Sequence, residues 1–286
     1  MIGSILEVIR IKHWVKNLFV FIPVFISGNI SNVDLFLNSL IIFLAFCFTA
    51  SSIYIINDLV DLERDKSHPV KKLRPLPSGK LSIISASLSL LFLILGAAII
   101  LSFVNFSGWL VISAYFFLNI LYSFYIKHIA ILDIVSISSG FVLRVQAGLA
   151  VTELNSSFWL IALTFALSML LAIGKRKGEF KNKDRNLSRP SLEGYSVNFL
   201  NILQGIFVTT IIIFYVLYTY FTETFPGDRS MLMYSSLFVI IGLCRYLQIN
   251  LSEESIDEPT DILYQDRFML LIVSSWVLYI FICLSL

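Results

Sequence analysis

The sequence predicts an all-α, polytopic membrane protein with nine transmembrane helices, and two observations support this prediction. Of the 286 residues, 57% are hydrophobic and only 14% are charged, whereas about a quarter of an ordinary soluble domain is charged. The apolar residues also form long blocks with few charges, which is typical of helices that cross a bilayer. The same balance excludes an intrinsically disordered chain, because disorder requires low hydrophobicity and high net charge.

A membrane-spanning helix needs about 20 apolar residues, each contributing about 1.5 Å of length. The first segment that meets this requirement is short and contains Pro23, so the pattern defines its ends least sharply. We expect all of the spans to belong to one integral membrane domain, residues 1–286. The nine expected spans are residues 15–30, 35–56, 83–104, 109–126, 131–149, 158–173, 200–221, 231–247 and 268–286.

The distribution of Lys and Arg predicts the orientation, because positive side chains are retained on the cytoplasmic side. The N-terminus and the segments 57–82, 127–130, 174–199 and 248–267 hold 18 of the 21 Lys and Arg residues, and the opposite loops hold only Arg229. We therefore expect a protein of the cytoplasmic (inner) membrane with its N-terminus inside and its C-terminus outside. The two long charged segments, about 57–82 and 174–199, are the expected catalytic loops.

An acidic motif follows the second span, where residues 57–65 are Asn-Asp-Leu-Val-Asp-Leu-Glu-Arg-Asp. Asn57, Asp61 and Asp65 recur every four residues, so a helix that extends the span would align them, with Asp58 beside them. Mg²⁺ prefers oxygen ligands and is usually shared between one or two carboxylates and the phosphates of a substrate. We expect Asp58, Asp61 and Asp65 to bind Mg²⁺, and Asn57 to contact metal or substrate. A solvated acidic helix end is the alternative.

Basic residues follow this motif at once, and they suit the oxygens of a diphosphate. Next comes the turn Arg-Pro-Leu-Pro-Ser-Gly at residues 74–79. Two prolines fix φ and Gly79 permits a sharp reversal, so we expect the turn to hold Arg74 in place. The basic residues that follow the motif are Lys66, His68, Lys71, Lys72 and Arg74.

Together, the acidic motif and the proline-rich turn resemble the first signature of the UbiA-type intramembrane prenyltransferases. This resemblance implies nine transmembrane helices around a central cavity that opens to the cytoplasmic side. It also implies Mg²⁺ on the aspartates and a diphosphate leaving group.

Further segments resemble one branch of this superfamily, the decaprenyl-phosphate phosphoribosyltransferases. The quinone-forming relatives have a second Asp-rich motif after the sixth span, but this chain has Gly-Lys-Arg-Lys-Gly-Glu at residues 174–179 and its next aspartate at Asp184. A basic segment favours direct binding of a phosphate. The segments that resemble the branch are Arg10-x-x-x-Trp14-Val15-Lys16-Asn17, Asp65-x-x-His68-Pro69-x-Lys71, Tyr122-Ser123-x-x-x-Lys127, Leu132-Asp133 and Gly174-Lys175-Arg176-x-x-Glu179.

The resemblance implies transfer of 5-phosphoribose from phosphoribosyl pyrophosphate to a polyprenyl phosphate, with release of diphosphate. The expected partners are these two substrates and the membrane lipids, with no nucleic acid, and the oligomeric state is open. The expected substrate contacts are Lys16, Asn17, Arg64, His68, Lys71, Arg74, Tyr122, Lys127, Asp133, Lys175, Arg176 and Glu179.

Two other functions remain open at this point. An aromatic prenyltransferase of quinone biosynthesis would use the same fold with a polyprenyl diphosphate donor. A transporter is compatible with the intramembrane residues Asp133 and Arg144, of which Arg144 would either face the cavity or extend to the outer surface. Gly140 and Gly148 would let a neighbouring helix approach closely. Lys and Arg of the inner loops also have simpler roles, in topology and in attracting anionic lipids.

Overall fold

The computed structural model describes residues 2–155, 157–181, 190–222, 225, 229–252 and 262–285, and its regular elements are all helical. Within these residues, eight helices are long and apolar enough to cross a membrane, and each coincides with a predicted span. The chain is therefore an all-helical polytopic membrane protein. The long helices are α3 (Val33–Val60), α5 (Ile83–Leu101), α6 (Phe106–Phe124), α7 (Leu132–Thr152), α8 (Phe158–Lys181), α9 (Val197–Phe221), α11 (Ser236–Leu251), which α10 (Arg229–Tyr234) precedes, and α13 (Arg267–Ser285).

The first predicted span, residues 15–30, is not one α-helix. After α1 (Ile2–Val8), the chain forms a 3₁₀ helix, η1 (Ile11–Phe21), and then the short α2 (Ile22–Ile26). Pro23 has no amide proton for the carbonyl of Phe19, so an α-helical bond is missing there. Instead, the amide of Ile22 donates to the carbonyl of Phe19, which is the three-residue spacing of a 3₁₀ helix.

The sixth predicted span, residues 158–173, is too short, because α8 continues to Lys181. Lys175 and Arg176 are therefore helical and do not lie in a loop. Lys, Arg and Glu are good helix formers, and Arg176 pairs with Glu179 three residues later, which adds to the helix. The remaining elements are short: α4 (Leu62–Lys66), η2 (Lys71–Leu73), η3 (Ile126–His128), η5 (Pro190–Gly194) and α12 (Ile262–Gln265).

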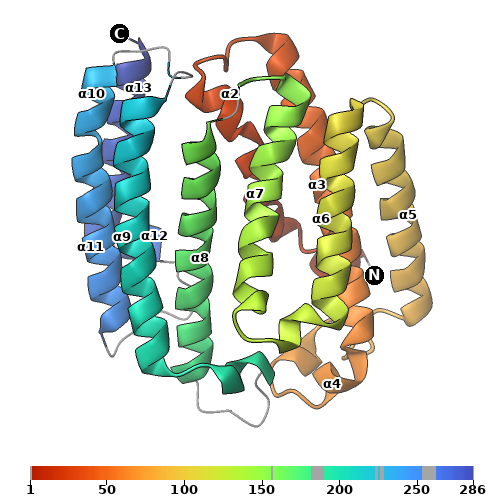
Figure 1. The fold of residues 1–286 in the computed structure, drawn as a ribbon. Helices are drawn as coiled ribbons and strands as arrows, with labels where there is room; N and C mark the ends of the chain where they lie inside the picture. Colours follow the sequence, from red (N-terminus) through yellow and green to blue (C-terminus); the bar gives the residue numbers. More distant parts are fainter. Residues whose placement is uncertain are drawn as a thin grey trace. The chain divides into compact units, whose positions relative to one another are not determined.

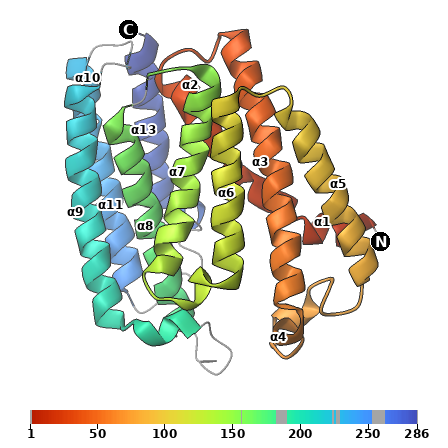
Figure 2. The ribbon, with the colours of Figure 1, turned by 45° about the vertical axis from the view of Figure 1, so that its right-hand side comes forward.

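The chain divides into two compact units, and α7 contributes residues to both. Unit 1 comprises residues 1–25, 29–127 and 143–154, and unit 2 comprises residues 26–28, 128–142 and 155–286. In unit 1, α3 packs against η1, α5 and α6; α2 lies near one end of α3 and α4 lies at the other (Figures 1 and 2). The core of unit 1 includes Val20, Ile42, Ala45, Phe46, Ile112, Tyr115 and Ala147.

Helix η1 runs antiparallel to α3, and the two keep a constant register. The paired side chains are Arg10 with Asp58, His13 with Tyr54, Trp14 with Ser51, Asn17 with Cys47, and Phe21 with Phe43. A 3₁₀ helix rises about 2.0 Å per residue, so the eleven residues of η1 cover about 22 Å. An α-helix rises about 1.5 Å, so Asp58 and Phe43 are also about 22 Å apart along α3. These equal lengths explain the constant register.

In unit 2, α8 packs against α9, and α11 packs against α9 and α13. Figure 1 shows α9 beside α11 in this unit. The core cluster between these helices is hydrophobic, and within it the hydroxyl of Tyr246 donates to the carbonyl of Leu170 at 3.5 Å. The core of unit 2 includes Ala166, Leu170, Val208, Ile211, Leu243, Tyr246 and Met269.

Candidate active site

The acidic motif lies at the end of α3, within unit 1. Helix α3 ends at Val60, Asp61 has φ −90° and ψ 5°, and α4 starts at Leu62. The single helical stripe that the sequence predicts is therefore interrupted at Asp61. Two backbone hydrogen bonds with helical spacing continue across the interruption. The amide of Asp61 donates to the carbonyl of Asn57, and the amide of Asp65 donates to the carbonyl of Asp61.

Asp58 and Asp65 share one guanidinium group. Arg74 Nη1 lies 2.7 Å from Asp65 Oδ2 and 3.3 Å from Asp58 Oδ1, and each carboxylate side chain is only 3% exposed. Arg10 Nη2 also contacts Asp58 Oδ1 at 2.5 Å, and Lys71 Nζ lies 3.9 Å from Asp65 Oδ1. Carboxylates buried this deeply need such partners, because desolvation penalises an unpaired charge.

Asp61 has a different partner, Lys127. Lys127 Nζ lies 2.6 Å from Asp61 Oδ1, and the lysine side chain is only 7% exposed. Lys127 belongs to η3, so a segment 66 residues away in the sequence provides the counter-ion of Asp61. Lys127, which was expected to contact substrate, therefore lies beside the acidic motif.

Arg10 also belongs to this site, because it pairs with Asp58, although it is not among the expected substrate contacts. It lies between α1 and η1 in the left-handed region, with φ 53° and ψ 53°, which is uncommon for a residue other than glycine. Its guanidinium carbon lies 4.7 Å from the centre of the Tyr54 ring. The only sequence signal was its place in the Arg10-x-x-x-Trp14 segment.

The turn at residues 74–79 reverses the chain at Gly79, as predicted. Gly79 has φ 76°, and the amide of Leu81 donates to the carbonyl of Pro75 at 3.0 Å. Leu76 and Leu81 are buried in a small core together with Val8 and Ile55 of the same unit.

His68 supports the loop that contains Lys71. Its Nδ1 accepts hydrogen bonds from the amides of Val70 and Lys71 at 3.2 and 3.3 Å. Burial of the imidazole lowers the pKa of His68, and the positive charge of Lys71 lowers it further. The neutral imidazole therefore serves as an acceptor in this turn.

The residues at the end of α3 fit a magnesium ion that shares its coordination with a substrate. Among the described residues, no three His, Cys, Asp or Glu side chains could hold a metal ion by themselves. Mg²⁺ does not require such a set, because one or two carboxylates usually suffice with water and phosphate oxygens. Asn57 Oδ1 is buried beside the acidic motif and lacks a hydrogen-bond partner. An orphaned oxygen of this kind is a suitable additional donor.

A second buried network, in unit 2, contains Asp133, Arg176 and Glu179. Arg176 Nε lies 2.8 Å from Asp133 Oδ2, and Arg176 Nη1 lies 2.6 Å from Glu179 Oε2. Asp133 also accepts from the hydroxyls of Ser191 and Tyr195. Burial and the hydrogen bond to Asp133 raise the pKa of Tyr195, which keeps its hydroxyl protonated. The side chains of Asp133 and Arg176 are 0% and 1% exposed, which favours a structural role for this pair.

Asn17 and Arg144 form a buried polar contact in unit 1. Arg144 Nε donates to Asn17 Oδ1 at 2.8 Å, and Arg144 Nη2 donates to Tyr115 at 2.8 Å. Arg144 is only 6% exposed, so it does not extend to the membrane surface. The amide nitrogen of Asn17 donates to Cys47 Sγ. Both ends of the Asn17 amide are thus used within the protein.

The other expected contacts are more exposed. Lys16 on η1, Tyr122 on α6 and Lys175 on α8 are partly buried, and Arg64 on α4 is exposed. Asp184 lies outside the described residues.

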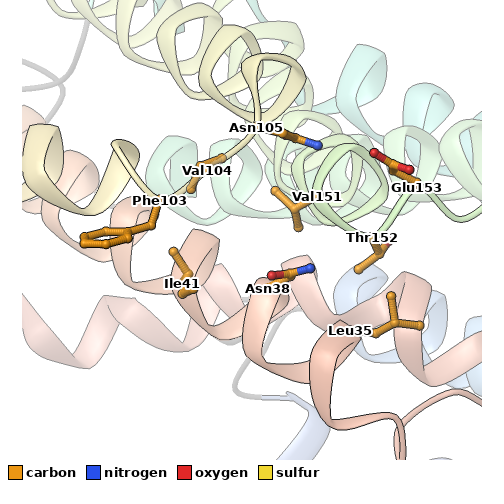
Figure 3. A pocket seen from close by; sticks show the side chains of 9 residues that line it. All are labelled: Leu35, Asn38, Ile41, Phe103, Val104, Asn105, Val151, Thr152 and Glu153. Atoms are coloured by element: carbon orange, nitrogen blue, oxygen red, sulfur yellow. The ribbon is translucent and has the colours of Figure 1, made fainter.

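A cavity of about 420 Å³ lies in unit 1. Its lining includes residues from the N-terminal end of α3 and the C-terminal end of α7 (Figure 3). Its lining combines apolar side chains with one carboxylate, Glu153, and the amides of Asn38 and Asn105. Asn105 already caps α6 and donates to the carbonyl of Ala150. The acidic motif lies at the opposite end of α3, so this cavity is not the candidate active site.

Comparisons with known proteins agree with this architecture. The chain is 28% identical to a decaprenyl-phosphate phosphoribosyltransferase from Mycolicibacterium smegmatis, over 97% of this chain and 91% of that protein. A protein of the same name from Corynebacterium glutamicum is 29% identical over 96% of this chain and 84% of its own length.

The fold is also similar to that of a UbiA homolog from Archaeoglobus fulgidus, solved bound to DMAPP and Mg²⁺. The TM-score is 0.75 at 17% identity, and the match covers 99% of both chains. The profile of the UbiA prenyltransferase family matches residues 18–272. The chain therefore belongs to the UbiA prenyltransferase family, a family of intramembrane transferases.

Proposed function

We propose that this transferase moves 5-phosphoribose from phosphoribosyl pyrophosphate to a polyprenyl phosphate and releases diphosphate. The observation that supports this most directly is the cluster at the end of α3, where basic side chains surround the buried carboxylates. The full-length similarity to proteins named decaprenyl-phosphate phosphoribosyltransferase supports the choice of substrates.

The aspartates and the cations have distinct roles in this proposal. Asp58, Asp61 and Asp65, with Asn57 Oδ1, would hold Mg²⁺, which when bound neutralises charge on the departing diphosphate. Arg74 and the neighbouring basic groups bind phosphate oxygens, which suit guanidinium and ammonium donors. The further contacts with the two phosphorylated substrates are proposed to involve Lys16, Arg64, Lys71, Tyr122, Lys127 and Lys175.

The transfer itself needs no strong base. The bond between the anomeric carbon and the diphosphate oxygen breaks, and the diphosphate leaves with the electron pair. An oxygen of the polyprenyl phosphate then forms the new bond to the anomeric carbon. A phosphate monoester is already largely ionised near neutral pH, so no proton must be removed from it.

We further propose the complete topology that the sequence suggests. Residues 11–26 form a ninth crossing, and the helices surround a central cavity that opens to the cytoplasm. The protein lies in the cytoplasmic membrane with its N-terminus inside and its C-terminus outside. The excess of Lys and Arg in the predicted inner segments supports this orientation.

The substrates can be tested with purified full-length protein in detergent. With Mg²⁺ present, we expect diphosphate release from phosphoribosyl pyrophosphate with polyprenyl phosphate, together with a phosphoribosylated lipid detected by mass spectrometry. Turnover only with a polyprenyl diphosphate and an aromatic acceptor would refute the phosphoribosyl proposal. Substrate flux into proteoliposomes without any covalent product would indicate a transporter instead.

The role of the aspartates can be tested by Asp61→Asn, which preserves the size of the side chain. We expect product formation to fall on the order of 100-fold, as on loss of one electrostatic contact to a reacting charge. The matched control is Asp34→Asn, which changes an exposed aspartate at the other end of α3. Equal rates for the two variants would remove the metal assignment.

A further inference from the structure

The turn between η3 and α7 contains a strained residue, Ile131. Its φ is 70°, and this left-handed region is a genuine outlier for a β-branched residue, because the side chain is crowded against the backbone there. Among the described residues, the other non-glycine residues with positive φ are Arg10 and Glu153, and neither is β-branched. Strain of this kind persists only where neighbouring groups fix it, and it is concentrated at functional sites.

Tyr195 provides the group that fixes this turn. Its hydroxyl oxygen accepts a hydrogen bond from the amide of Ile131 at 2.6 Å, and the same hydroxyl donates to Asp133 Oδ1 at 2.6 Å. One hydroxyl therefore joins the strained turn to the first turn of α7. Asp133 also accepts from Ser191 at 3.0 Å and from Arg176 Nε at 2.8 Å, so the carboxylate that orients the tyrosine is itself held in place.

The segment that contains Tyr195 packs closely on the turn. A Cβ atom added at Gly194 would lie 2.6 Å from the Cβ atom of Ala130, which is too close for two carbon atoms that are not bonded. Tyr195 is only 5% exposed and belongs to a hydrophobic cluster with Ile134 and Leu192. The core of unit 2 therefore determines the position of the Tyr195 hydroxyl.

We propose that Tyr195 is a positioning residue that, through the strained turn at Ile131, keeps Lys127 in its ion pair with Asp61. Lys127 lies four residues before Ile131 in the chain, and its Nζ lies 2.6 Å from Asp61 Oδ1. Relaxation of Ile131 to a negative φ changes the direction in which the preceding residues leave α7, and so draws the lysine away from the aspartate. The inference rests on the proposed function in one respect, because an effect on turnover requires Asp61 to belong to the active site.

The position of Lys127 can be measured without turnover. Purified full-length protein in detergent is acetylated with a water-soluble succinimidyl ester, and modification of Lys127 is quantified by mass spectrometry, with the exposed Lys72 as internal reference. The lysine side chain is only 7% exposed, so modification of the wild type is slow. In Tyr195→Phe the amide of Ile131 loses its acceptor, and we expect modification of Lys127 to be at least about fivefold faster, the factor that corresponds to release of one strained residue. Tyr220→Phe changes a tyrosine on α9 that is 66% exposed, and it should leave the rate unchanged.

A second substitution separates positioning from a general loss of stability. Glycine adopts a φ of 70° without strain, so Ile131→Gly added to Tyr195→Phe should return the modification of Lys127 to within about twofold of the wild type. Ile131→Val retains a β-branched side chain, and in the same background it should give no rescue. Asp133 lacks the tyrosine hydroxyl in both double variants, so a purely structural effect would be the same in the two.

Turnover should follow the same order as the protection of Lys127. With the donor that the protein uses, we expect Tyr195→Phe to be slower than the wild type, the double variant with glycine to regain activity, and the double variant with valine to remain slow. Failure of the proposed function would change which donor is turned over, and it would leave the modification of Lys127 as described.

Two results would overturn the inference: unchanged modification of Lys127 in Tyr195→Phe, and equal modification in the two double variants. If Tyr195→Phe does not fold, as judged by size-exclusion chromatography, Ile131→Gly alone decides. Relief of strain should raise the thermal unfolding temperature of this variant above that of the wild type. A lower unfolding temperature would show that the turn stores no strain for Tyr195 to hold.

Discussion

At the scale of single residues, His68 gives the loop of the acidic motif a dependence on pH. Its folded-state pKa is lowered, so the protonated form favours the unfolded loop, and stability is lost as the pH falls below about 6.5. We expect thermal unfolding of the wild type to shift to lower temperature between pH 7.5 and 5.5. His68→Asn retains an acceptor near the position of Nδ1 but does not titrate, so this shift should be smaller in the variant.

The pair Asp133–Arg176 leads to a prediction about stability. Arg176→Met would leave the fully buried carboxylate of Asp133 without its cation, and breaking a buried pair in this way typically costs about 3–5 kcal/mol. Thermal unfolding in detergent measures the effect. Lys175→Met, at the neighbouring and more exposed position, is the control and should change the unfolding temperature much less. A smaller effect for Arg176→Met than for Lys175→Met would show that the pair is not structural.

These residues also show what a sequence can reveal about a site. The motif of Asp58, Asp61 and Asp65 and the turn at Arg74 are local, so their spacing predicts their proximity. Arg10 is 48 residues from Asp58, and no local pattern connects them. Asp133 and Arg176 were expected to contact substrate because their segments resemble those of the phosphoribosyltransferase branch. Sequence alone could not show that these two charges are buried against each other.

At the scale of elements, the length of an apolar block predicts a span but not its helix type. Helix η1 contains the polar residues His13, Trp14 and Asn17, all of which have partners on α3. These contacts and Pro23 together favour the longer rise of a 3₁₀ helix. The close approach that Gly148 was predicted to allow is confirmed, and it involves this same element.

A substitution at Gly148 tests whether the close contact between α7 and η1 is required. A Cβ atom at this position would lie 2.1 Å from the carbonyl oxygen of Val20, and a backbone atom cannot rotate away. We therefore expect Gly148→Ala to displace η1, lower the unfolding temperature and reduce activity. Gly205→Ala is the control, because nothing lies within 4 Å of its added Cβ and alanine favours a helix by about 1 kcal/mol. Unchanged stability in Gly148→Ala would show that the contact is not required.

At the scale of the whole molecule, hydropathy predicted eight of the spans, because a continuous apolar block of membrane length has few other stable structures. The residue boundaries of the two compact units could not be predicted from the sequence. They depend on which helix faces pack together, and the spans of this chain are apolar on all sides, so periodicity gives little guidance.

The proposed orientation depends on whether residues 11–26 cross the bilayer. The eleven residues of η1 and the five of α2 have a combined length of about 30 Å, which equals the thickness of the hydrocarbon core. With this crossing the N-terminus lies on the same side of the membrane as the acidic motif, in agreement with the ion pair between Arg10 and Asp58.

Labelling with a membrane-impermeant maleimide tests this topology. Single cysteines would be placed at Gly3, Glu63 and Glu153, all exposed, in a background in which the native Cys47, Cys244 and Cys283 are replaced. In intact cells we expect Glu153→Cys to be labelled, and Gly3→Cys and Glu63→Cys to be labelled only after permeabilisation. Labelling of Gly3→Cys in intact cells would place the N-terminus outside, and the proposal that residues 11–26 form the ninth crossing would be wrong.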